Sequence, residues 1–254
     1  MAHILTIDTA TTACSVALVK DGTVQALREN NQGLNHSVLL APYIDALLRE
    51  HRLEVRDLDA IAVSMGPGSY TGLRIGVSTA KGLCFGAGIP LIAVPTLRAL
   101  ARAVADRTGE DALYCPMLLG FLRVSVCLFV GHPENKITRK YPMLAARRME
   151  VYPPLFDRHN PPLTPTRAEI ITPDSFAEEL ADRTVYFFGN GSDKARPLLT
   201  SPHARFIPGV ETSAAHLAPL AEQLFREGEF ADTAYFEPFY LKDFIATTPK
   251  KKVL

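Results

Sequence analysis

The order of the apolar segments in the first hundred residues constrains the fold more than any other feature of the sequence. Short β-branched segments with alternating polarity predict strands, and longer segments with apolar residues three and four apart predict helices. The expected elements are a strand at 3–10, a hairpin at 14–29, a helix at 36–51, a strand at 59–66, a helix at 70–86, a strand at 90–94 and a helix at 95–109. This order predicts an α/β lobe in which a mixed sheet is flanked by helices.

The second half of the chain has less regular patterning, and it predicts a second lobe. We expect strands at 111–118, 123–130 and 147–157, a helix at 172–182 capped by Thr172, a strand with a glycine turn and a short helix at 184–199, and a helix at 213–228. We place the lobe boundary near Thr108, so that the N-terminal lobe spans 1–108 and the C-terminal lobe spans 109–254.

The composition excludes several classes of protein. The formal net charge of the 254 residues is zero, which argues against a protein that grips nucleic acid unaided, because such proteins cluster Lys and Arg. The four cysteines are far apart and form no C-x-x-C pair, as expected for reduced thiols. The N-terminal segment has no signal-peptide pattern, and the apolar stretches are too short to span a bilayer. We therefore expect a soluble cytoplasmic protein without a membrane association.

The stretch SMGPGSYTGLRIGVSTAKGLCFG, at 64–86, is rich in glycine but matches no nucleotide-binding motif. It lacks the Lys-Ser/Thr of a phosphate loop, and the spacing of Gly66, Gly68 and Gly72 is one residue too long for a dinucleotide fingerprint. A glycine turn before a helix nevertheless presents free N–H groups at a positive helix end. Direct anion binding at Gly66 and Gly68 therefore stays open.

The expected helix at 70–86 carries a stripe of small residues, Gly72, Gly76 and Ala80. A glycine within a helix costs about 1 kcal/mol relative to alanine, so two of them indicate that something approaches this helix closely. One alternative is the sheet or a neighbouring helix of the same chain. The other is a subunit interface shared with the helix at 36–50.

His36, at the start of that preceding helix, is the histidine most worth testing as a metal ligand. A helical metal site would need a second histidine four residues later, and that position is Leu40, which cannot ligate. We expect no metal site.

Four segments together resemble the TsaB family, also called YeaZ: ILTIDTATTACSVAL, HSVLLAPYIDALL, DAIAVSMGPGSYTGLRIGVSTAKGL and IPLIAVPTLRALA. The resemblance covers residues 3–105 and resumes in ARRMEVYPPLFD, FFGNGSDKARPLL and EPFYLKDF. It implies an actin-like ATPase fold (ASKHA, RNase H-like), with two lobes that each hold a mixed sheet flanked by helices. It further implies a non-catalytic subunit of the complex that forms N6-threonylcarbamoyladenosine at position 37 of tRNAs reading ANN codons.

The resemblance also implies partners. The family binds and activates the catalytic subunit TsaD together with the ATPase TsaE, contacts tRNA only through the complex, and can form a homodimer in isolation. TsaD has an H-x-x-x-H metal site, and the matching residues here are His36 and Leu40, so the site is lost. The implied interface residues are His36, Leu39, Leu40, Tyr43, Ile44, Leu73, Ile75, Gly76, Val77 and Thr79.

A nucleotide cleft is the remaining candidate site. The candidates for nucleotide or anion binding are Asp8, Thr9, Thr11, Gly66, Gly68, Gly189, Asn190 and Gly191. Any cofactor would be ATP or ADP at an interface of the complex. The competing interpretations are a capped turn at Asp8 and an ordinary glycine turn at 189–191.

The alternative function is a stand-alone actin-like phosphotransferase or a glycoprotease-like hydrolase. A phosphotransferase needs a Mg²⁺-binding carboxylate and an acid near the acceptor, and only Asp8 is available. A hydrolase would need Ser69, His36 and Asp8 to come together, and nothing in their spacing groups them. We therefore expect no catalytic residues.

The chain departs from the family pattern in the second lobe. Residues 119–143 form an atypical insertion, and Ala145 replaces the acid that the family carries there. The insertion includes LRVSVCLFV, a β-prone apolar segment that would be an extra strand of this lobe.

Overall fold

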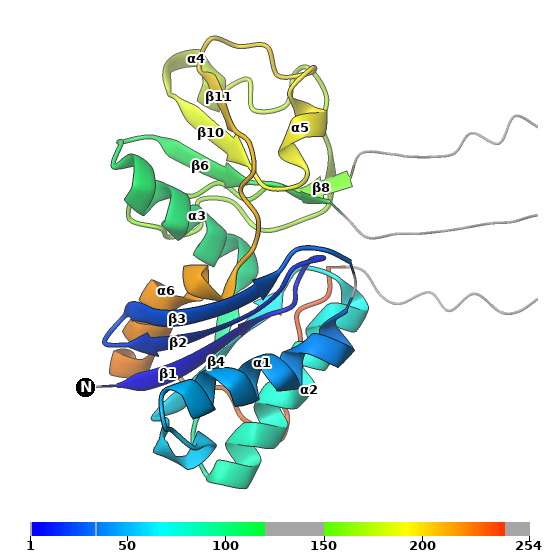
Figure 1. Ribbon diagram of the computed structural model, residues 1–254. Helices are drawn as coiled ribbons and strands as arrows, with labels where there is room; N and C mark the ends of the chain where they lie inside the picture. The colour runs from blue at the N-terminus through cyan, green and yellow to red at the C-terminus, as the bar shows by residue number, and fades with distance from the viewer. Residues whose placement is uncertain (1, 34, 120–149, 242–254) are drawn as a thin grey trace, which may run out of the picture.

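The computed structural model describes residues 2–33, 35–119 and 150–241. It has two lobes, one above the other in Figure 1. Of the insertion predicted at 119–143, only Leu119 is described, and it lies in a strand; residues 120–143, which include the strand expected at 123–130, and Ala145 lie outside the described residues. Among the helices that are described, none has the length and apolarity needed to cross a membrane.

The first lobe is built on a five-stranded mixed sheet, as predicted. The strands are β1 His3–Asp8, β2 Cys14–Lys20, β3 Thr23–Asn30, β4 Ala60–Gly66 and β5 Leu91–Pro95. Their order is β3-β2-β1-β4-β5, in which the first three strands pair antiparallel and β4 and β5 join parallel. The expected hairpin is present, with positive φ at both Asp21 (48°) and Gly22 (75°), which suits the twist of paired strands.

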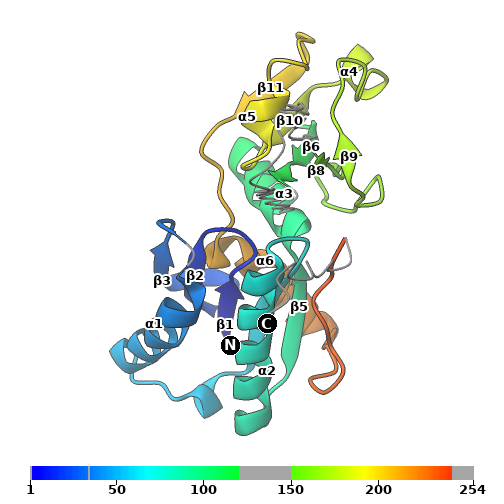
Figure 2. The ribbon, with the colours of Figure 1, turned by 90° about the vertical axis from the view of Figure 1, so that its right-hand side faces the viewer.

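Two pairs of helices cover the two faces of this sheet. One face carries α1 His36–Glu50 and α2 Tyr70–Ala87, with the short η1 Val55–Asp57 between them along the chain. The other face is covered by α6 Ala214–Glu227 together with the start of α3 Thr96–Thr108. Figures 1 and 2 show the sheet between these layers. The predicted helices of the first lobe are therefore confirmed.

Alternate residues of the central strand serve the two faces. Leu5 and Ile7 enter the core under α1 and α2, whereas Ile4 enters the core under α6. The hydroxyl of Thr6 points to the α6 side and donates to Ala214 O at 2.8 Å. Successive residues of β1 therefore enter two separate cores, one on each face of the sheet.

The second lobe contains two small sheets in the described residues. The strands β6 Leu113–Pro116, β10 Val185–Phe188 and β11 Ala204–Ile207 are parallel, in the order β11-β10-β6. The strands β7 Leu118–Leu119, β8 Glu150–Tyr152 and β9 Glu169–Ile170 are antiparallel. The helices of this lobe, α4 Glu179–Asp182 and α5 Ser192–Ala195, are single turns.

The prediction of a helix at 172–182 is mostly wrong, because only the last turn of this segment is α-helical. Phe176 has a φ of 61°, a left-handed conformation that interrupts a right-handed helix. Its ring packs against Phe187 of β10 at a centroid distance of 5.3 Å. Packing on the sheet therefore overrides a local pattern that favoured a longer helix.

The chain returns to the first lobe after β11. The helix α6 packs on β1, β2 and β4 of the first sheet, although it follows the second lobe in sequence. Residues 229–241, which we call the C-terminal strap, then run without regular structure beside α2 and β5 (Figure 2). The division of the chain at residue 108 stays a prediction.

Candidate functional site

The predicted interface residues on α1 and α2 divide into two groups. Most are buried in the core of this chain, and they are His36, Leu40, Ile44, Leu73, Gly76 and Val77. The remainder are half-buried, and they are Leu39, Tyr43, Ile75 and Thr79. Only this second group remains accessible to another protein in the structure as it stands.

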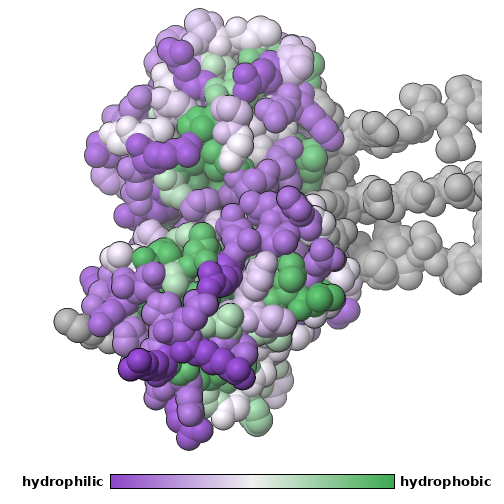
Figure 3. Space-filling model, viewed as in Figure 1, coloured by the Kyte–Doolittle hydropathy of each residue, from purple (hydrophilic) through white to green (hydrophobic). Residues whose placement is uncertain are grey.

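Two apolar side chains on the same helices are much more exposed than the predicted set. Val38 on α1 is 67% exposed and Phe85 on α2 is 86% exposed. Figure 3 shows apolar surface on the right of the lower lobe, over the N-terminal part of α1. We call the accessible side of α1 and α2, which carries Val38, Phe85 and the half-buried group named above, the outer face. The sequence did not single out either residue, because helical spacing identifies a buried side but gives apolar residues on the other side no pattern.

The glycine stripe of α2 faces the chain's own β1–β2 loop. A Cβ atom at Gly72 would overlap the carbonyl oxygen of Thr9, and one at Gly76 would overlap the hydroxyl of Thr9. That hydroxyl donates to Gly72 O at 2.8 Å. The intramolecular alternative therefore accounts for the close approach that the stripe predicted.

The N-terminal end of α2 is likewise filled by the chain itself. Ser69 N donates to Ala10 O at 2.6 Å, and a Cβ atom at Gly68 would overlap Ala10. Gly66, with a φ of 112°, lies against the strap, where Phe239 O is 2.5 Å from the position of a Cβ atom. An anion at this turn would have to displace Ala10, so anion binding at Gly66 and Gly68 stays a prediction.

Asp8 lies at the end of β1 and is almost completely buried. Its carboxylate accepts a hydrogen bond from Ala10 N at 2.9 Å, which fixes the β1–β2 loop. Burial raises the pKa of this carboxyl from 3.8 to about 6, and the hydrogen bond from Ala10 and the neighbouring Ser64 hydroxyl act in the opposite direction. The carboxylate therefore has the role of a loop cap, which was one of the two interpretations of this residue.

The other cleft candidates are also engaged in contacts within the chain. Thr11 shares a hydrogen bond of 2.8 Å with the hydroxyl of Thr212, which precedes α6. In the second lobe, Asn190 Oδ1 accepts from Leu119 N at 2.9 Å, and Gly191 N donates to Met117 O at 2.9 Å. The turn at 189–191 is thus held against the β6–β7 junction, and its binding of nucleotide stays a prediction.

His36 joins α1 to the β1–β2 loop. Its Nε2 lies 2.9 Å from Thr11 O, so this nitrogen carries the proton and donates it. The other ring nitrogen is buried and has no hydrogen-bond partner among the described residues. Burial lowers the pKa of His36, so the ring is neutral at physiological pH. In the described part of the chain, no group of three or more His, Cys, Asp or Glu side chains is arranged to hold a metal ion.

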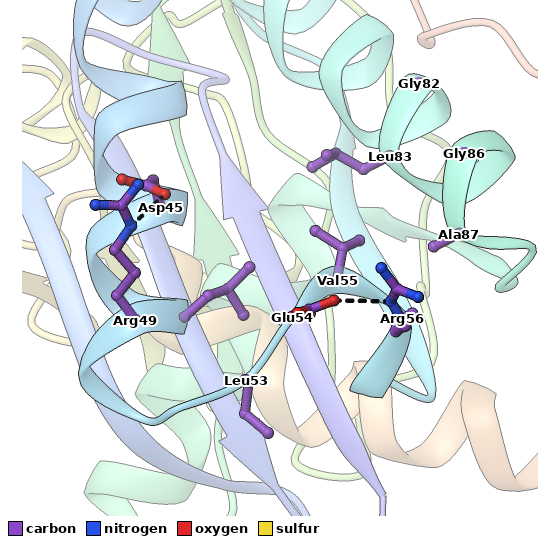
Figure 4. Close-up of a pocket in the computed structure, with 11 residues that line it drawn as sticks. Asp45, Arg49, Leu53, Glu54, Val55, Arg56, Gly82, Leu83, Gly86 and Ala87 are labelled. Carbon is purple, nitrogen blue, oxygen red and sulfur yellow. Dashed lines mark ion pairs between the residues drawn. The ribbon is translucent and has the colours of Figure 1, made fainter.

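A groove that the sequence did not predict lies between the C-terminal ends of α1 and α2 and the η1 turn. Its volume is about 820 Å³, and Figure 4 shows ion pairs on its rim, Asp45–Arg49 at 2.9 Å and Glu54–Arg56 at 2.8 Å. The apolar and glycine residues that line it include Leu48, Leu53, Val55, Gly82, Leu83 and Gly86. The sequence signal for this groove was the pair Gly82 and Gly86, four residues apart on the expected helix. In the structure a Cβ atom at either position would meet nothing within 4 Å, so both glycines face open space.

Comparison with known proteins gives consistent relatives. Residues 30–120 match the family model described as TsaD: tRNA N6-adenosine threonylcarbamoyltransferase. The chain is 30% identical over 251 residues to the tRNA threonylcarbamoyladenosine biosynthesis protein TsaB of Escherichia coli, with 96% of each chain covered. It is 32% identical over 256 residues to TsaB of Bacillus subtilis, with 94% of this chain and 93% of that protein covered.

Solved structures share the fold of both lobes. A crystal structure of a Pseudomonas aeruginosa protein with similarity to the peptidase YEAZ superimposes with a TM-score of 0.72, and a structure of YeaZ from the same organism with 0.69. Each is 24% identical in sequence, and each alignment covers 95% of this chain and 100% of the other.

The glycine contacts predict opposite effects for the same substitution at two positions of α2. Gly72→Ala should lower the free energy of unfolding by about 3 kcal/mol, because the added methyl group overlaps backbone that cannot retreat. Gly82→Ala should raise it by about 1 kcal/mol, because the position is exposed and helical. Urea denaturation of both variants measures the difference. Equal effects at the two positions would contradict the assigned contact with Thr9.

The environment of Asp8 predicts a pH-dependent contribution to stability. A pKa raised from 3.8 to about 6 means that the folded chain binds this proton more tightly, so the resulting stability is present below pH 4 and is lost as the pH rises through 6. The magnitude is on the order of 3 kcal/mol. Asp8→Asn keeps an acceptor for Ala10 N and should remove this contribution from urea denaturation profiles between pH 4 and pH 8.

A control is needed because His36 acts in the opposite direction. Its pKa lies below 6.5, so the neutral ring favours folding above that pH and the stability is lost as the pH falls. Subtracting the pH profile of stability of Asp8→Asn from that of the wild type cancels the contribution of His36. Asp182→Asn, at an exposed carboxylate, controls for the loss of one negative charge. If Asp8→Asn and Asp182→Asn have the same pH profile of stability, the burial of Asp8 makes no pH-dependent contribution to stability.

Proposed function

The chain belongs to the TsaB (YeaZ) family of tRNA threonylcarbamoyladenosine biosynthesis proteins, and from this premise we propose that it is a non-catalytic subunit that binds a TsaD-like catalytic subunit through the outer face of α1 and α2. Its fold is the two-lobed actin-like (ASKHA) fold with mixed sheets flanked by helices, as expected from the sequence. The reaction context is the threonylcarbamoyl modification of adenosine in tRNA.

The observation that carries this proposal is the exposed apolar surface on two adjacent helices whose inner sides already pack against the core of this chain. Val38 and Phe85 are exposed, while Leu40, Ile44 and Val77 of the same helices are buried in the core. Aromatic and aliphatic side chains on a rigid scaffold, rimmed by charges, are typical of protein-binding surfaces. On the same helices Leu39, Tyr43, Ile75 and Thr79 are half-buried, and they extend the surface to residues that the family resemblance implied.

The family model that matches residues 30–120 supports the choice of partner. This segment contains α1 and α2, and the model describes the transferase itself. A TsaD-like partner would therefore present a related pair of helices, so that similar surfaces meet. Packing between two helix pairs follows the same rules as packing within a helical bundle.

The cleft supports a subunit without chemistry of its own. Asp8 caps a loop, and Thr9 and Thr11 donate to or share hydrogen bonds within the chain. Phosphoryl transfer needs a carboxylate that is free to bind Mg²⁺, and the structure uses Asp8 for a structural hydrogen bond. In the proposed complex the catalytic residues and the metal belong to the partner.

The proposed assembly includes further components. A TsaE-like ATPase joins the two subunits, ATP or ADP binds at an interface of the complex, and tRNA contacts this chain only through the assembly. A neutral net charge suits such an arrangement, because a subunit that does not grip phosphates needs no basic surface. The proposed product is N6-threonylcarbamoyladenosine at position 37 of tRNAs that read ANN codons, formed in the cytoplasm. Self-association through the outer face is expected when the partner is absent.

A charge placed on the outer face should abolish binding without unfolding the chain. Val38→Glu introduces a carboxylate in the first turn of α1, where the helix dipole favours it, so the isolated protein should remain folded. Burying that carboxylate against a partner is costly, and we expect affinity for the TsaD-like subunit to fall on the order of 100-fold. Calorimetric titration of the two purified proteins gives the affinity.

The matched control places the same charge elsewhere. Leu163 is an apolar residue of the second lobe that is 49% exposed, and Leu163→Glu should bind the partner normally. Substitution of Leu40 or Gly76 would not separate binding from folding, because both are buried within the chain. Wild-type affinity for Val38→Glu would overturn the proposed docking face.

The competing function, a stand-alone phosphotransferase or hydrolase, makes a different prediction. The purified chain should not hydrolyse ATP above background with Mg²⁺, and Asp8→Asn should leave threonylcarbamoyladenosine formation by the reconstituted complex within about threefold of wild type. Release of phosphate and incorporation of labelled threonine into tRNA are the two measurements. Metal-dependent ATP turnover by the chain alone, lost in Asp8→Asn, would establish the competing function instead.

A further inference from the structure

The C-terminal strap contacts both lobes although it has no regular secondary structure. Near its start, Ala231 N donates to Leu91 O on the edge of β5 at 2.8 Å. At its end, Leu241 packs against the apolar cluster that α3 forms with the second lobe. The strap therefore joins the lobes in addition to α3 and the segment that leads into α6.

A lysine on α2 holds the middle of the strap. Lys81 Nζ donates to Ala234 O at 3.1 Å and to Phe236 O at 2.9 Å. The strap turns just before this point, because Asp232 Oδ1 accepts from Ala234 N at 2.8 Å and Tyr235 N at 3.1 Å. The turn presents its carbonyls on one side, where a single ammonium group with three donors satisfies two of them.

A second attachment lies at the N-terminal end of α2. Phe239 N donates to Met65 O at 2.7 Å, and Phe239 O occupies the space beside Gly66 that a side chain would need. The ring of Tyr240 lies 4.7 Å from the ring of Tyr70, the first residue of α2. The glycine turn before α2 thus contacts the strap at Gly66 and the β1–β2 loop at Gly68.

An apolar cavity of about 280 Å³ lies beneath this attachment, at the junction of the lobes. Its walls come from the first lobe, the start of α3, the second lobe and the strap, and they include Met65, Pro67, Pro95, Leu97, Thr166 and Phe239. Phe239 is itself 41% exposed, so one wall of the cavity is a side chain at the surface. Removal of the strap would take away the wall of the cavity that Phe239 forms and would break one contact between the lobes.

We propose that the strap is a releasable latch, which Lys81 and Met65 hold closed and whose release removes one wall of the interlobe cavity and loosens the second lobe from the first. A short segment with few hydrogen bonds and exposed apolar side chains, such as Tyr235 at 85% exposure, opens at a lower free energy than the helices beneath it. The latch depends only on contacts within this chain, so it does not rest on the proposed partner.

Hydrogen–deuterium exchange of the full chain tests the latch. Lys81→Met keeps the length of the side chain and removes both hydrogen bonds. We expect exchange in peptides covering 229–241 to rise at least tenfold, and exchange in peptides covering 65–69 and 153–168 to rise at least threefold, while β1 and α6 stay unchanged. Lys194→Met, at an exposed lysine of α5, is the matched control and should match wild type throughout.

Two further variants separate a latch from a passive segment. Leu241→Asp removes the contact with the second lobe, so exchange at 153–168 should rise at least threefold while the Lys81 attachment keeps 229–236 protected. Tyr235→Ser changes only an exposed side chain of the strap and should have no effect. The proposal is overturned if the strap exchanges at the wild-type rate in Lys81→Met, or if it opens in that variant while 153–168 remains protected. It is also overturned if all of α2 loses protection in Lys81→Met, because Lys81 would then stabilise the helix and not the strap.

Discussion

The close fit between the β1–β2 loop and the bare glycine side of α2 is the contact on which the rest of the first lobe depends. Thr9 and Ala10 occupy the space that side chains at positions 68, 72 and 76 would take. This fit lets the loop carbonyls reach Ser69 N and the ring of His36, so one short loop connects β1, α1 and α2. The same fit fills the helix end at which related sequence patterns place a phosphate.

The electrostatic environment of Asp8 and His36 favours a rigid β1–β2 loop. Asp8 and His36 are both buried, and burial shifts each pKa toward the neutral form of its side chain. His36 is neutral at physiological pH, whereas Asp8, with a pKa of about 6, is ionised there. Both side chains are hydrogen-bonded to the backbone of the β1–β2 loop, so they stabilise its geometry. The chemical groups at the end of β1 therefore serve the architecture, while the proposed docking surface lies on the outside of α1 and α2.

The sequence was sufficient for the parts of the fold that follow from local pattern. Alternation in β1 and the Asp21-Gly22 turn predicted the meander, and the glycine spacing of α2 predicted a close approach. The sequence did not identify Thr9 as the group that approaches, because that contact joins residues more than sixty positions apart. Long-range packing also decided the features that pattern missed, namely the return of α6 to the first sheet, the break at Phe176 and the outward position of Phe85.

The bridge between Ala231 and Leu91 has a consequence for the solubility of the fold. The sheet has two edges, β3 and β5, and an unpaired edge can recruit a strand from another molecule. The strap covers β5 at Leu91, and the prolines that bracket this strand remove two further donors. A chain that lost its last segment to proteolysis would therefore expose a strand border that the intact protein keeps covered, and it would aggregate more readily.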